Sequence, residues 1–184
     1  MKRLISKVKQ VLFGAVVRTR ARTVGKGLKV NRYSWVSKSV VLGDNVNFNG
    51  MRIVGEGEIR IGSNFHSGRG CSIIGSFHDF DYGDAVPYGM AKIDKDVVIE
   101  DNVWLGDQVI VLGGAHIGEG AVIQAGSVVV DHVPKGAVAG GHPAKSVQDA
   151  RYGSLRSSES TRSVLLIFAT KSRKKRVGSR LITR

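Results

Sequence analysis

Residues 99–129 read IEDNVWLGDQVIVLGGAHIGEGAVIQAGSVV, and an aliphatic residue occupies every sixth position of this stretch. These positions are Ile99, Leu105, Val111, Ile117, Ile123 and Val129. An α-helix repeats about every 3.6 residues and a strand about every 2, so neither produces a strict period of six. A parallel β-helix does, because each hexapeptide forms one flat side of a coil and its first residue points to the axis. The stretch therefore predicts an all-β solenoid.

The same period extends toward the N-terminus and is interrupted once. Its first residues there are Val24, Val30, Val36, Leu42, Phe48 and Val54, followed after a slip of one residue by Ile61, Ser67 and Ile73. With three hexapeptides to a coil, residues 24–148 are predicted to form about five triangular coils. The period is absent between Ile73 and Ile93, so we expect residues 74–92 to form a loop that leaves the solenoid. Long loops of this kind commonly carry function.

Both ends of the chain fall outside the six-residue period. Residues 1–23 are predicted to form a basic N-terminal helix or arm, in which five aliphatic residues share one face: Leu4, Ile5, Val8, Val11 and Leu12. We expect this face to cap the stack, because the end coil of a solenoid needs a cover. Residues 144–151 read as loop or helix, and residues 149–184 are predicted to be a basic C-terminal extension.

The formal net charge of +13 is concentrated at the two ends. Residues 1–38 contain 11 Lys and Arg and no acid, and residues 151–184 contain 10 and one acid. The part between, residues 39–150, has 7 basic and 14 acidic residues. Basic ends suit a peripheral contact with an anionic membrane, or nonspecific contacts with nucleic acid, or are solvated tails. Of the two partners, we favour the membrane over nucleic acid.

The remaining composition narrows the class of protein. A single cysteine excludes an internal disulfide, and Cys71, at an inward position, is predicted to be a plain buried thiol rather than a nucleophile. There is no apolar run of about 20 residues and no secretory signal pattern, so a cytoplasmic protein is expected. No metal is expected either, because His66 and His78 have no third histidine in a matching register for zinc.

Several motifs together resemble a known family. They are VWLG at 103–106, AHIGEGAVI at 115–123, AGSVV at 125–129, VPKG at 133–136 and GHPAK at 141–145. Over roughly residues 35–148 the chain resembles the hexapeptide acyltransferases, of the maltose/galactoside O-acetyltransferase type and its polysaccharide-biosynthesis branch. The resemblance implies a left-handed parallel β-helix, a homotrimer, acetyl-coenzyme A as co-substrate, and active sites between subunits under an extended loop.

The resemblance also implies roles for individual residues. His78, beside the predicted loop, matches the family's catalytic histidine, and an imidazole is a suitable base at neutral pH. Asn49 matches a residue that positions the acceptor or stabilises the oxyanion. We expect the acceptor to be bound by Asp79, Asp81 and Tyr88. The positions expected to contact coenzyme A are Trp104, Gly106, Asp107, Ala125, Gly126, Val130 and Lys145, and Lys145 suits a phosphate.

These observations predict an acetyl-coenzyme A-dependent O-acetyltransferase that acts on a sugar hydroxyl in surface polysaccharide biosynthesis. Two alternatives stay open. One is an N-acyltransferase acting on an amino sugar, which needs the same kind of base. The other is a non-catalytic binding solenoid whose basic arms hold a partner.

Overall fold

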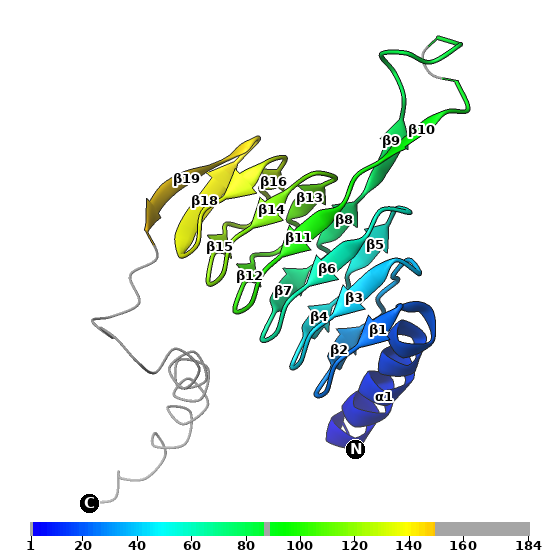
Figure 1. Cartoon of the computed structure of the whole chain (residues 1–184). Helices are drawn as coiled ribbons and strands as arrows, with labels where there is room; N and C mark the ends of the chain where they lie inside the picture. The colour runs from blue at the N-terminus through cyan, green and yellow to red at the C-terminus, as the bar shows by residue number, and fades with distance from the viewer. Residues whose placement is uncertain (1, 87–88, 150–184) are drawn as a thin grey trace, which may run out of the picture. The chain divides into compact units, whose positions relative to one another are not determined.

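The computed structural model of the chain describes residues 2–86 and 89–149, and three parallel sheets dominate this part (Figure 1). The first sheet contains β1 (Thr23–Val24), β3 (Val40–Leu42), β6 (Ile59–Ile61), β11 (Val97–Ile99), β14 (His116–Ile117) and β17 (His132–Val133). The second contains β2 (Lys29–Arg32), β4 (Asn47–Asn49), β7 (His66–Arg69), β12 (Trp104–Leu105), β15 (Val122–Ile123) and β18 (Ala137–Gly141), with β19 (Ala144–Asp149) antiparallel at its edge. The third contains β5 (Arg52–Val54), β8 (Ser72–Ile74), β13 (Ile110–Leu112) and β16 (Val128–Val129).

The chain visits the three sheets in turn, so each round of three strands is one turn of a left-handed β-helix. The predicted solenoid is confirmed, with about six turns rather than five. Within these sheets, strands of successive turns pair in parallel, as β11 does with β6 and β14 (Figure 1). Stability in such a fold comes from the contact of each turn with its neighbours.

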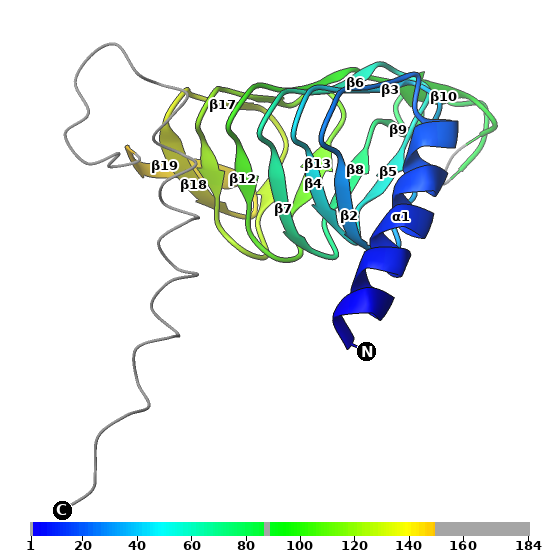
Figure 2. The same ribbon diagram turned by 90° about the horizontal axis from the view of Figure 1, so that it is seen from below.

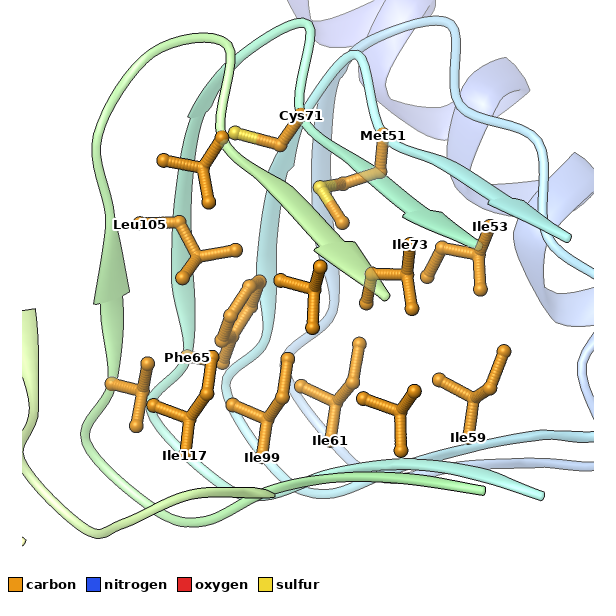
Figure 3. Close-up of a cluster of buried hydrophobic side chains, with 14 of the residues drawn as sticks. Met51, Ile53, Ile59, Ile61, Phe65, Cys71, Ile73, Ile99, Leu105 and Ile117 are labelled. Atoms are coloured by element: carbon orange, nitrogen blue, oxygen red, sulfur yellow. The ribbon is translucent and has the colours of Figure 1, made fainter. Parts of the chain in front are cut away.

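The core is a set of aliphatic columns that run along the inside of the solenoid. Ile61, Ile99 and Ile117 form one column on the first sheet, and Ile53 and Ile73 line the third (Figure 3). Phe48 and Phe65 meet edge to face with ring centroids 6.0 Å apart, and both are buried. Each buried aliphatic or aromatic side chain stabilises the fold by about 1.5–3 kcal/mol through removal of apolar area from water. The six-residue period exists because one side chain per strand must reach this axis.

The inward position in β5 differs from the sequence prediction by one residue. The expected inward residue was Val54, but Ile53 is fully buried and Val54 is half-buried. The shift follows a register irregularity between Asn47 and Asn49 in the preceding strand. The inward residues are therefore five apart from Phe48 to Ile53 and eight apart from Ile53 to Ile61, so the period is irregular on both sides of Ile53.

A ladder of asparagines holds the turns together at one corner of the solenoid. Asn45, Asn64 and Asn102 have φ of 55°, 57° and 62°, a left-handed conformation that asparagine tolerates at tight corners. The side-chain amide of Asn45 donates to Asn64 over 2.9 Å, and that of Asn64 donates to Asn102 over 3.0 Å. Stacked amides of this kind fix the corner of one turn above the corner of the next.

The predicted excursion between the two blocks of repeats is confirmed as an extended hairpin (Figure 1). Strands β9 (Ser76–His78) and β10 (Lys92–Asp94) pair in antiparallel fashion and form its base. Ile93 belongs to this hairpin, where it pairs with Phe77, and so does not line the solenoid. Only the residues between the two strands form the loop proper.

The N-terminal segment forms the helix α1 (Lys2–Arg20), which lies against β2. The predicted helix is confirmed, but the face expected to cap the stack is wrong. Val17 is buried, Phe13 packs on the core, and Leu4, Val8 and Val11 are exposed. The face that contains Phe13 covers the first turn, because the rings of Phe13 and Tyr33 pack edge to face with their centroids 6.0 Å apart.

The C-terminal end of the solenoid is also an ordered element. Residues 144–149, expected to be loop or helix, form β19, which runs antiparallel to β18 with Lys145 opposite Gly140. The reversal supplies the edge of the second sheet with a partner strand. The rest of the expected basic extension lies outside the described residues.

Candidate active site

The hairpin positions His78 at the point where its loop begins. His78 is the last residue of β9 and pairs with Lys92 of β10. The base of the hairpin is fixed by a contact between the Ser76 hydroxyl and the Asp94 carboxylate, and by the Lys95 ammonium 5.6 Å from the centre of the Phe77 ring. The half-buried imidazole is therefore held on a paired strand rather than on a free loop.

The ring of His78 has a defined partner across the loop. Its Nδ1 lies 3.1 Å from the carbonyl oxygen of Gly89, which is buried. A carbonyl oxygen only accepts hydrogen bonds, so this contact places the proton on Nδ1 and the lone pair on Nε2. An imidazole whose Nε2 carries the lone pair is the form that a general base needs.

The two carboxylates that follow His78, Asp79 and Asp81, differ in their surroundings. Asp79 accepts the backbone N–H groups of Asp81 and Tyr82 over 3.1 and 2.9 Å, and so shapes the start of the loop. The ring of His78 contacts the carbonyl of Gly89. Asp81 is exposed, and Tyr88 lies outside the described residues.

Asn49 lies on the second sheet, away from the hairpin that follows the third. Its Oδ1 accepts from the Asn31 amide over 2.8 Å, and its Nδ2 donates to the carbonyl of Ser67 over 2.6 Å. Asn31 also donates to Asn47 over 2.9 Å. Within one chain, these partners tie Asn49 to neighbouring turns of the second sheet, whereas His78 contacts its own loop.

Four of the positions expected to contact coenzyme A come together at one corner. The N–H of Gly126 donates to the carbonyl of Asp107 over 2.8 Å, which stacks the turn after β15 on the turn after β12. A Cβ at Gly106 would lie 2.6 Å from the nitrogen of Ala125, so this close approach requires glycine. At Gly126 an added Cβ would meet nothing within 4 Å, so the corner is open on that side.

The other three expected positions are more dispersed. Trp104 lies on the second sheet in register with His66 and Val122, and its indole is exposed. Lys145 is an exposed cation on β19. Val130 directly follows β16 of the third sheet, and Gly126 lies just before that strand. One chain thus places Val130 and Gly126 at opposite ends of β16.

Sequence reasoning missed two residues at these places. Gly89 holds the His78 ring, and only its position in the polar loop hinted at a role. His142 contacts the carbonyl of Gly126 through Nε2, so it lies beside this corner. The GHPAK motif marked this segment, but a contact across 16 residues cannot be read from the motif.

The buried thiol and the second-sheet histidine have environments that suit structural roles. Burial raises the pKa of the Cys71 thiol, and its Sγ donates to the carbonyl of Gly106 over 3.1 Å. Burial lowers the pKa of His66. Within residues 2–86 and 89–149, no three His, Cys, Asp or Glu side chains lie together as a metal-binding group. No helix in this part of the chain is long and apolar enough to cross a membrane.

The amino-acid sequence is similar to a known protein family and to a curated protein. Residues 96–131 match the family described as bacterial transferase hexapeptide, six repeats. An acetyltransferase-like protein of Schizosaccharomyces pombe is 38% identical over 93 residues, which cover 49% of this chain and 42% of that protein. The chain thus spans less than half the length of this curated relative.

Two solved structures share the fold. A hexapeptide-repeat acetyltransferase of Vibrio cholerae, solved with acetyl-coenzyme A, is 28% identical, with a TM-score of 0.67 over 74% of this chain and 75% of that one. A galactoside acetyltransferase, solved with coenzyme A, is 24% identical, with a TM-score of 0.65 over 86% of this chain and 88% of that one. Residues 96–131 thus match bacterial transferase hexapeptide repeats, and the described chain has the left-handed β-helix seen in hexapeptide acetyltransferases.

Proposed function

We propose that the chain is an acetyl-coenzyme A-dependent O-acetyltransferase that acts on a sugar hydroxyl in surface polysaccharide biosynthesis. The observation that carries the proposal is the His78–Gly89 contact beside an extended loop, in which Nδ1 donates to the carbonyl so that the lone pair of the ring is on Nε2. The acetyl-coenzyme A complex of the Vibrio cholerae protein supports the donor. The galactoside acetyltransferase, similar in fold, supports a sugar acceptor.

In the proposed reaction, Nε2 of His78 removes the proton of the sugar hydroxyl as the hydroxyl oxygen attacks the acetyl carbonyl carbon. The new C–O bond forms, the C–S bond of the thioester breaks, and the coenzyme leaves as the thiol after taking a proton. The imidazolium of His78 can return that proton to the sulfur, which restores the base. General base catalysis of this kind contributes about 10²–10⁴-fold.

The corner at Asp107, Ala125 and Gly126 fits the coenzyme. It is open above Gly126, and the small residues there allow a chain to approach the backbone. Lys145 is exposed and supplies a cation for a phosphate. We assign the pantetheine to this corner and the phosphates to the side of Lys145.

A homotrimer is part of the proposal. The loop of His78 leaves the third sheet, while Asn49 and Trp104 lie on the second. A second copy can offer its second sheet to the loop of the first, which completes a site that one chain leaves divided. Light scattering tests the assembly: a monomer in solution would contradict it.

The proposed compartment is the cytoplasm, with peripheral contact between the basic ends of the chain and an anionic membrane. The single cysteine, buried and unpaired, suits a reducing compartment. The excess of Lys and Arg in residues 1–38 suits anionic lipid.

The deciding experiment measures thiol release from acetyl-coenzyme A with a panel of sugars, followed by mass spectrometry of the product. Acetyl esters that alkali removes indicate O-transfer, whereas an alkali-stable amide on an amino sugar indicates the N-acyltransferase alternative. Calorimetry with coenzyme A tests the binding-solenoid alternative, which predicts no binding.

A further inference from the structure

Helix α1 presents an aliphatic face to the outside of the protein. The exposed side chains on this face are Leu4 (68%), Ile5 (49%), Val8 (51%), Val11 (71%) and Leu12 (59%). At about 100° per residue they form one stripe along the first three turns of the helix. Single exposed aliphatic residues are ordinary on protein surfaces, but a continuous stripe along one helix face marks an interaction surface.

The opposite face of α1 is fixed to the solenoid. Phe13 meets the edge of the Tyr33 ring, and Val17 is fully buried. The Arg20 guanidinium lies 3.4 Å from the centre of the Trp35 ring, and its Nε donates to the carbonyl of Val36 over 2.9 Å. Rotating the helix to bury the stripe would break all of these contacts, so the stripe stays outside. Figure 2 shows α1 lying beside β2 at the end of the solenoid.

Cations border the stripe on both sides. The helical spacing puts Lys7 and Arg18 along one edge and Lys9 along the other, and all three are exposed. No acidic residue occurs anywhere in residues 1–38. The outward surface of α1 therefore combines an apolar strip with a border of purely positive charge.

We infer that the outward face of α1, formed by Leu4, Ile5, Val8, Val11 and Leu12, docks on an anionic lipid bilayer. The aliphatic side chains enter the boundary between headgroups and acyl chains, and the flanking cations stay at the level of the lipid phosphates. Lipid suits this face better than a second copy of α1, because two such faces would bring like charges together along both edges. The helix lies in the plane of the membrane, since it is not long and apolar enough to cross it.

This inference deepens the proposed membrane contact by naming the surface that makes it, and it does not depend on acetyl transfer. Docking through α1 would turn the N-terminal end of the solenoid toward the bilayer. The contact is of the interfacial kind, so it is reversible and depends on both apolar area and lipid charge.

The test is flotation of the full-length protein with vesicles of phosphatidylcholine, with or without phosphatidylglycerol. We expect the wild type to float with the anionic vesicles, and Val8→Gln/Val11→Gln to lower the lipid partition coefficient at least about ten-fold. The matched control is Val147→Gln, an exposed valine on β19, which should float like the wild type. Lys7→Gln/Lys9→Gln should weaken binding and reduce its dependence on salt.

Three results would overturn the inference. The first is a wild type that does not float with the anionic vesicles. The second is a Val8→Gln/Val11→Gln variant that floats as well as the wild type. The third is a molar mass of that variant that, measured by light scattering without lipid, is smaller than that of the wild type. The second result would assign the contact to another basic segment, and the third would assign the face to a second copy. Circular dichroism checks that the variants keep α1. Thiol release with a sugar acceptor should be the same for the α1 variants as for the wild type. If the wild type released no thiol, that result would count only against the acetyltransferase proposal.

Discussion

The Nδ1 atom of His78 lies 3.1 Å from the carbonyl oxygen of Gly89, across a loop that leaves and re-enters the solenoid. The contact joins the strand that ends at His78 to the returning limb of the hairpin. Because a backbone carbonyl has no proton to give, this contact favours the imidazole tautomer with its proton on Nδ1. The candidate base is thus oriented in part by a residue at the other end of its own loop.

Replacing His78 should remove most of the transfer activity. His78→Ala eliminates the proposed base, so kcat should fall by about 10²–10⁴-fold, while the KM for acetyl-coenzyme A changes little. Thiol release under saturating acceptor measures both constants. His132→Ala is the matched control, because His132 is an exposed histidine on the first sheet, far along the chain from the loop. An unchanged kcat for His78→Ala would falsify the base assignment.

Crowding the partner of the imidazole should lower kcat without removing the base. A Cβ at Gly89 would collide with Oδ1 of Asp84 and lie 3.0 Å from its Cγ and 3.3 Å from its backbone nitrogen, so Gly89→Ala requires the Asp84 side chain or the loop backbone to shift. We expect a fall in kcat of about ten-fold, because misplacing a positioned group is costly.

The second-site variant Asp84→Ala removes the atoms that clash. The double variant Gly89→Ala/Asp84→Ala should therefore recover part of the lost kcat, a coupling that a double-mutant cycle measures. If the double variant were as slow as the product of the two single effects, steric displacement of Gly89 would not be the cause.

Asn49 should contribute to stability whether or not it touches the acceptor. Asn49→Ala removes one hydrogen bond from Asn31 and one to Ser67, so the free energy of unfolding should fall by about 1–3 kcal/mol. Urea unfolding measures this loss. Asn47→Ala, which removes a single bond from Asn31, is the control and should cost less. A fall in kcat for Asn49→Ala at a temperature where the variant is fully folded would support the proposed acceptor role.

Two adjacent residues of β5 test the inward register. Ile53 is fully buried and Val54 is half-buried, so Ile53→Ala should lower the free energy of unfolding by about 2–5 kcal/mol. Val54→Ala removes less buried area and should cost less than half as much. Equal losses in urea unfolding would show that both side chains contribute alike to the core.

The pKa of His66 predicts a pH dependence of stability. Burial holds this pKa below the ordinary value, so at mildly acidic pH the unfolded chain binds more protons at this site than the folded one. The contribution of His66 to the free energy of unfolding is therefore complete above about pH 6.5 and declines as the pH falls through that value toward the lower folded pKa. His66→Gln should flatten this part of the curve. Urea unfolding between about pH 5 and 8 measures the difference, and parallel curves for the two proteins would contradict it.

Much of the fold was predictable because a solenoid repeats one local solution. Ile99, Leu105 and Val111 occupy equivalent inward places, so their spacing alone reports the geometry of a whole turn. The interruption after Ile73 was visible for the same reason, and it pointed to His78. The inward residue of β5 was predicted to be Val54 rather than Ile53, because both are β-branched aliphatic residues and the register irregularity beside them lies in the previous strand.

The candidate site was less predictable, because its parts come from segments that only folding brings together. His142 reaches the carbonyl of Gly126 only because β19 folds back on β18. The corner at Asp107 and Gly126 was expected from the resemblance, but the openness above Gly126 depends on the stacking of two turns.

The solenoid, the place of its interruption and an N-terminal helix within residues 1–23 could all be predicted from the sequence, since each depends on a period that neighbouring residues set. The tertiary structure decided which face of α1 is covered. The sequence offers apolar side chains on both faces, Phe13 and Val17 on one and Val8 and Val11 on the other. The choice depends on Tyr33 and Trp35, which the first turn brings back against the helix. The period of a helix shows which residues share a face. Which face is buried depends on the side chains of the first turn of the solenoid, which pack against the helix only in the folded protein.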